Sequence, residues 1–105
     1  MAADVVDVPD RARFEARVGG EIAGIVEYRH SPGVIVFVHT EIDPRFEGRG
    51  IASELVRAAL SAARSQGLAV LPLCPFVRSY IARHREYLDL VPDNARARLE
   101  LSANG

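Results

Sequence analysis

The sequence predicts a mixed α/β (α+β) fold in which an antiparallel meander is followed by a strand–helix–parallel strand unit and a final helix. Three observations support this prediction. β-Prone runs alternate with glycine turns in the first part of the chain. The apolar period then changes to the helical one from Ile51 onward. Finally, 105 residues with 49% hydrophobic content are enough for one core and too few for two, so 1–105 is expected to be a single domain.

The meander begins with two predicted strands joined by a tight turn. Residues 14–18 alternate apolar and charged side chains, Gly19-Gly20 is a strong hairpin signal, and 22–28 is the next β-prone run. A second glycine turn leads to a third strand at 34–42. This strand starts with a continuous β-branched and aromatic run, which is typical of strands covered on both faces, so it is expected to be central.

An amphipathic helix is predicted after the third strand. Its apolar residues recur at helical spacing and are Ile51, Ala52, Leu55, Val56, Ala59, Leu60 and Ala63. Gly67 can close the helix in the left-handed conformation, and 68–73 is predicted as a short buried strand. This unit should place 68–73 parallel to 34–42 through a right-handed crossover. A last helix is expected from Pro75 to about residue 85.

The two ends carry weaker signals. Residues 1–10 are polar and acidic and predict a loose leader or a short first strand, and 92–105 predicts a partly ordered tail. The first residues include acids where a signal peptide needs basic and apolar ones, and no stretch approaches the roughly 20 apolar residues of a membrane span. A soluble, cytoplasmic protein without a membrane partner is expected.

Charge and cysteine content exclude several functional classes. The formal net charge is -1, so the chain lacks the positive field with which nucleic-acid binders displace counterions, and no nucleic-acid partner is expected. Cys74 is the single cysteine, so neither an intrachain disulfide nor a cysteine-based zinc site can form. No metal is expected. The remaining possibilities are a small-molecule or protein partner.

The turn before the predicted helix is the candidate functional site. The first amides of a helix lack intrahelical acceptors and lie at the positive end of the helix dipole, so a turn without side chains there binds phosphate well. Gly48 and Gly50 remove the Cβ atoms that would block such a ligand, and Arg45 and Arg49 add positive charge. An anionic ligand is therefore expected.

This region resembles the GNAT superfamily of acyl-CoA N-acyltransferases. The superfamily pattern is a strand ending in an aliphatic residue, then x-Pro-x-x-[Gln/Arg]-Gly-x-Gly-[aliphatic]-[Gly/Ala]. Here it is Ile42-Asp43-Pro44-Arg45-Phe46-Glu47-Gly48-Arg49-Gly50-Ile51-Ala52. Glu47 departs from the pattern, because a carboxylate cannot help to hold a pyrophosphate. Either its side chain turns away or coenzyme affinity is reduced, with Arg45 and Arg49 as possible compensation.

A second motif is similar to that of the small stand-alone N-acetyltransferase-like proteins of this superfamily, which lack the usual first helices. Their marks are a His-Thr-Glu end to the central strand, here His39-Thr40-Glu41, and a Pro-x-Cys-x-[Phe/Tyr] segment, here Pro72-Leu73-Cys74-Pro75-Phe76. The matches span 14–90. The resemblance implies a GNAT-like fold, with acetyl-CoA or coenzyme A as co-substrate and an unidentified amine acceptor, either a small molecule, a peptide or a protein. A monomer or homodimer is expected.

The resemblance also implies where the coenzyme lies. The sheet would splay between 34–42 and 68–73, with the pantetheine arm in the gap pairing with the backbone near Thr40, and the thioester near Cys74. The expected coenzyme contacts are Thr40, Ile42, Arg45, Glu47, Gly48, Arg49, Gly50, Ile51, Ala52, Ser53, Cys74 and Phe76. In the family mechanism, a deprotonated amine attacks the thioester carbonyl, backbone N–H groups hold the oxyanion, and an acid protonates the leaving thiolate.

Four residues are candidates for catalysis, each with a structural alternative. Cys74 is a nucleophile, a proton donor or a small core residue. Tyr80 could protonate the thiolate or pack in the core. His39 and Glu41 share a strand face and could accept the amine proton, or belong to a solvated strand end. Arg78 is expected on a solvated helix face, with coenzyme binding as the alternative.

Rival interpretations remain. A dinucleotide site fits poorly, because Ser53 stands where the third glycine of that motif belongs. A Walker A loop is excluded because the chain contains no lysine. A non-catalytic acyl-CoA-binding module and an interaction domain without coenzyme are the two alternatives to an enzyme.

Overall fold

A computed structural model describes residues 3–99 and 101. The described residues form five strands, namely β1 (Asp4–Val8), β2 (Arg13–Val18), β3 (Glu21–Ser31), β4 (Val34–Ile42) and β5 (Ala69–Pro72). The α-helices are α1 (Ile51–Ser65), α2 (Pro75–Arg83) and α3 (Asp93–Arg98). Short 3-10 helices lie at η1 (Pro9–Arg11), η2 (Pro44–Phe46) and η3 (Arg85–Leu90). No helix in the described part of the chain is long and apolar enough to cross a membrane.

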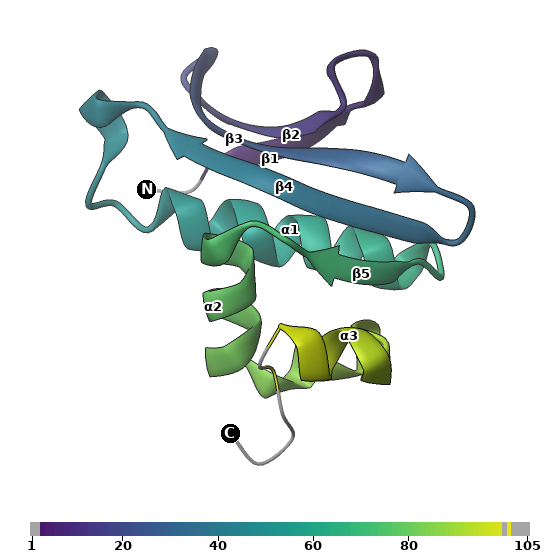
Figure 1. Cartoon of the computed structure of the whole chain (residues 1–105). Helices are drawn as coiled ribbons and strands as arrows, with labels where there is room; N and C mark the ends of the chain where they lie inside the picture. The colour runs from purple at the N-terminus through teal and green to yellow at the C-terminus, as the bar shows by residue number, and fades with distance from the viewer. Residues whose placement is uncertain (1–2, 100, 102–105) are drawn as a thin grey trace.

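The strands form one mixed sheet in the order β1-β2-β3-β4-β5 (Figure 1). The first four strands are antiparallel neighbours, and β5 pairs with β4 in parallel after the chain has passed through α1. The predicted meander, helix and parallel strand are thereby confirmed. The two glycine turns lie where they were expected, between β2 and β3 and between β3 and β4.

The core lies between the sheet and α1, which runs along one sheet face (Figure 1). The buried residues of α1 are Ile51, Leu55, Val56, Ala59, Leu60 and Ala63, as its apolar period predicted. The helix ends in a Schellman motif: Gly67 has a φ of 69°, and the amide of Leu68 donates to the carbonyl of Ala63 at 2.9 Å. The chain then turns directly into β5.

The expectation that both faces of β4 are covered is wrong. Ile35 and Phe37 are buried on the α1 side, whereas Val34 and Val36 on the other face are only half-buried. A run of β-branched residues cannot distinguish these situations, because Val is also common on the half-exposed face of antiparallel strands.

The chain ends are more regular than the sequence predicted. Residues 4–8, within the segment expected to be a loose leader or a strand, form β1 and pair with β2. Within 92–105, six residues form α3, and Ala95 and Leu101 are buried in the core, as is Val91 just before this segment. These three apolar side chains explain why the segment packs against the body of the molecule. Residues 1–2, 100 and 102–105 lie outside the described residues.

Candidate functional site

The sheet opens between β4 and β5 at the expected place. The parallel pairing covers 34–37 of β4 and 69–72 of β5, and the amide of Cys74 still donates to the carbonyl of Phe37 at 2.9 Å. Beyond Phe37, β4 continues to Ile42, and among the described residues only β3 pairs with this part of the strand. One strand thus has a paired half and an open half, and Cys74 lies at the junction of the two.

A β-bulge marks the start of the open half. Tyr28 pairs with Phe37 and Glu27 pairs with His39, so Val38 has no partner on β3. The extra residue reverses which side chains face α1. Before the bulge they are Ile35 and Phe37, and after it they are Thr40 and Ile42, while His39 and Glu41 point to the opposite face.

The hydrogen-bond pattern leaves backbone groups of the open half free to bind. The amide of Asp43 donates to Ala23 O at 2.8 Å, so this opposed pair is a hydrogen-bonded one. In an antiparallel ladder such pairs alternate with non-bonded ones. With the observed register, Glu41 and His39 bond to β3, whereas the backbone N–H and C=O groups of Thr40 and Ile42 point toward the gap. An extended ligand could pair with this edge as an added strand does.

The gap leads to the glycine turn at the start of α1. Gly48 and Gly50 have φ values of 80° and 74°, a conformation that favours glycine, and a Cβ at either position would meet no heavy atom within 4 Å. Gly50 is the N-cap of α1 and carries no capping side chain, so no cap competes for the first amides of this 15-residue helix. The groove measures about 380 Å³ and is lined by Ile42, Phe46, Glu47, Gly48, Gly50, Ile51, Ala52, Ser53 and Phe76.

The two arginines of the turn differ in their partners. Arg45 donates to Asp43 and, at 2.9 Å, to Glu21, and the hydrogen bond from Arg45 holds the pKa of the Asp43 carboxyl below its usual range. Arg49 forms no ion pair with any carboxylate of the described residues, and its guanidinium lies 5.4 Å from the centre of the Phe46 ring. Arg49 is therefore the more available cation beside the groove.

Cys74 is buried at the fork of the strands. Its side chain is 3% exposed, and Sγ lies 3.2 Å from Thr40 Oγ1, which makes a polar contact across the gap. The turn that carries Cys74 is held from the next helix: Arg78 donates to the carbonyls of Pro72 and Leu73, the latter at 3.0 Å. Sequence reasoning assigned Arg78 to a solvated face and missed this role, which no local motif signals.

The other catalytic candidates lie apart from this fork. His39 and Glu41 are exposed on the opposite sheet face, with 3.6 Å between His39 Nε2 and Glu41 Oε1. Tyr80 is buried, its ring stacks on His84 with centroids 3.9 Å apart, and burial raises its pKa. Within the described residues Tyr80 makes no hydrogen bond to Cys74 or Thr40. The structure thus brings Thr40 and Cys74 together at the fork. The predicted contact residues of the glycine turn lie together along the groove.

Comparisons with known proteins agree with this arrangement. Residues 13–90 match the family model of the GCN5-related N-acetyltransferases. No curated protein matches the chain. It is similar to the NMR structure of a GCN5-like protein from Staphylococcus aureus, described as a candidate N-acetyltransferase: the two are 19% identical, the likeness covers 85% of this chain and 87% of that one, and the TM-score is 0.66. At this identity the likeness shows a common fold. From the match over 13–90, the chain belongs to the GCN5-related N-acetyltransferase family.

Proposed function

We propose that this protein is an acetyl-CoA-dependent N-acetyltransferase that moves an acetyl group to a primary amine. The observation that carries the proposal is the continuity of three features: the junction at Cys74, the open backbone edge at Thr40 and Ile42, and the glycine turn at the N-terminus of α1. An extended ligand with an anionic end and a reactive group at the other end fits this series of sites.

The coenzyme would be held mainly by backbone groups. Its pyrophosphate would lie on the first amides of α1, at Ile51, Ala52 and Ser53, where Gly48 and Gly50 leave room for it. Arg49 would add positive charge. Phe76 lines the same groove and would contact the pantetheine arm as it passes from Ile42 toward Cys74.

The reaction needs one proton acceptor and one proton donor. The neutral amine nitrogen attacks the thioester carbonyl, the C–S bond breaks, the nitrogen loses one proton as the amide forms, and the coenzyme thiolate takes up a proton. We assign the role of proton acceptor, directly or through water, to His39 or Glu41, because both are exposed on the open half of β4. We assign the role of proton donor to the coenzyme thiolate to Cys74 in preference to Tyr80, because Cys74 lies at the fork beside Thr40.

Two measurements test the proposal. Thiol release from acetyl-CoA is followed with a panel of primary amines that includes alkylamines, amino acids and lysine peptides, and calorimetry measures coenzyme A binding. Amine-dependent thiol release is expected. Binding without turnover for any amine would favour a non-catalytic acyl-CoA-binding module. Absence of binding at millimolar coenzyme A would overturn the proposal and favour an interaction domain.

A further inference from the structure

Gly24 differs from the other glycines of the described chain in what surrounds its missing side chain. A Cβ at Gly24 would lie 2.5 Å from Ile42 Cδ1 and 3.1 Å from the carbonyl oxygen of Glu41, whereas at the other six described glycines it would meet no heavy atom within 4 Å. Gly24 is also the one among these seven without a positive φ. Backbone conformation therefore does not require glycine at position 24, but the space occupied by Ile42 does.

The register explains the close approach. Gly24 on β3 pairs with Ile42 on β4, and the hydrogen bond of the next pair, from Asp43 to Ala23, makes this a non-bonded pair. In such pairs the Cα atoms approach to about 4.5 Å, and opposed side chains compete for the same space. Because Gly24 has no side chain, the Ile42 side chain can pack over the backbone of β3 at this position.

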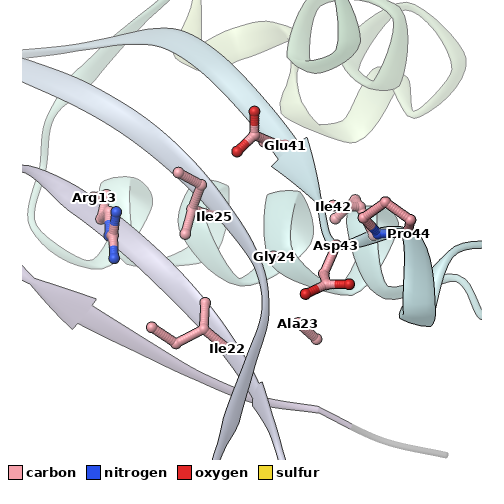
Figure 2. Close-up of a pocket in the computed structure, with 9 residues that line it drawn as sticks. All are labelled: Arg13, Ile22, Ala23, Gly24, Ile25, Glu41, Ile42, Asp43 and Pro44. Carbon is pink, nitrogen blue, oxygen red and sulfur yellow. The ribbon is translucent and has the colours of Figure 1, made fainter.

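Ile42 is the shared wall of two cavities. On one side it lines the groove of about 380 Å³ that leads to the glycine turn, together with Phe46 and Gly50. On the other side it borders a cavity of about 320 Å³ around Gly24, with Ile25 and Glu41 also on the walls (Figure 2). The position of the Ile42 side chain therefore sets the width of the groove.

We propose that Gly24 is a positioning residue for the coenzyme groove: by leaving space over β3 for Ile42, it keeps the groove open where the pantetheine arm meets the pyrophosphate site. This inference rests on the proposed coenzyme-dependent function. A methyl group at position 24 would displace Ile42 Cδ1, and the carbonyl of Glu41 already restricts the space on the β3 side. Of the two cavities that border Ile42, the groove lies on the α1 side, the face to which the Ile42 side chain points.

A rescue experiment tests the inference. Calorimetry with coenzyme A compares wild type, Gly24→Ala, Ile42→Val and the double variant, and thermal unfolding without ligand monitors the fold. Gly24→Ala should weaken binding about tenfold, equivalent to about 1.4 kcal/mol and within the range for overpacking. Ile42→Val removes Cδ1, so Gly24→Ala should weaken binding much less in the Ile42→Val background than it does in the wild-type background. A merely structural role for Gly24 would lower the unfolding temperature without changing the affinity of the folded protein.

The outcomes separate this inference from the function on which it rests. No binding by wild type would overturn both. The inference alone would be overturned if wild type binds coenzyme A and Gly24→Ala binds it with the same affinity. It would also be overturned if Gly24→Ala weakens binding as much in the Ile42→Val background as in wild type. If Gly24→Ala does not fold, Ile42→Phe provides a second test, because the larger ring has to project into the groove. It should lose coenzyme affinity while remaining folded, and normal affinity would overturn the inference.

Discussion

The two halves of β4 have different roles although they belong to one strand. In 34–37 the backbone is paired on both sides, by β3 and by β5, and serves the sheet alone. In 38–42 the bulge at Val38 and the departure of β5 leave one edge without a strand, with Thr40 and Ile42 facing the gap. An open backbone edge can therefore arise within a structural strand from one extra residue and one neighbouring strand that ends early.

The largest effect is expected at Cys74, where the two halves meet. Cys74→Ala should lower turnover by about a hundredfold, the lower end of what a positioned proton donor contributes, while coenzyme A affinity stays near that of wild type. Thiol release and calorimetry measure the two quantities. Because Cys74 is the single cysteine, alkylation provides an independent check, and saturating coenzyme A should slow it. Full turnover in Cys74→Ala would restrict the residue to packing.

Gly33, in the turn before β4, and Gly50, at the N-cap of α1, form a matched pair. Gly33, before the paired half, and Gly50, after the open half, both have a φ of 74° and open space around them. Valine at either position should cost a similar unfolding free energy, roughly 2 kcal/mol. Only Gly50→Val should also weaken coenzyme A binding, by about thirtyfold, because its side chain occupies the pyrophosphate site. Equal affinities of the two folded variants would place the phosphate site elsewhere.

Substitutions of the two arginines of the turn should change coenzyme A affinity by a smaller factor than Gly50→Val does. Arg49→Gln should weaken coenzyme A binding about fivefold at low salt, and less at high salt, because an exposed charge contributes about 1 kcal/mol that ions screen. Arg45→Gln is the control, since Arg45 is engaged by Asp43 and Glu21 and its loss should change affinity less. Titration calorimetry at two ionic strengths measures both. A stronger effect of Arg45→Gln would show that its ion pairs reorganise when the coenzyme binds.

Glu47 should have the smallest effect. Its side chain is exposed and forms no ion pair within the described residues, although it lines the groove. Glu47→Gln removes one negative charge and should tighten coenzyme A binding by no more than about twofold, because solvent screens an exposed charge. The same calorimetric series measures it. A marked loss of affinity would mean that the carboxylate has a useful contact in the complex.

Much of the fold could be predicted because its signals are local. The apolar period of α1, the glycine turns and the breaker at Gly67 each depend on residues close in sequence. The bulge could not be predicted, since Val38 lies in an unbroken β-prone run and the irregularity appears only in its pairing with β3. The partners of Arg45 and the contact of Gly24 with Ile42 are likewise set by register, which a single sequence does not specify.

Hydrogen exchange of the β4 amides tests most directly whether the open half binds the coenzyme. The amides of His39 and Glu41 bond to β3 and should be protected with or without ligand, whereas those of Thr40 and Ile42 face the gap. Saturating coenzyme A should slow exchange at Thr40 and Ile42 and leave the paired half at 34–37 unchanged. Exchange at Thr40 and Ile42 that saturating ligand does not alter would contradict the assignment of this edge as the coenzyme site.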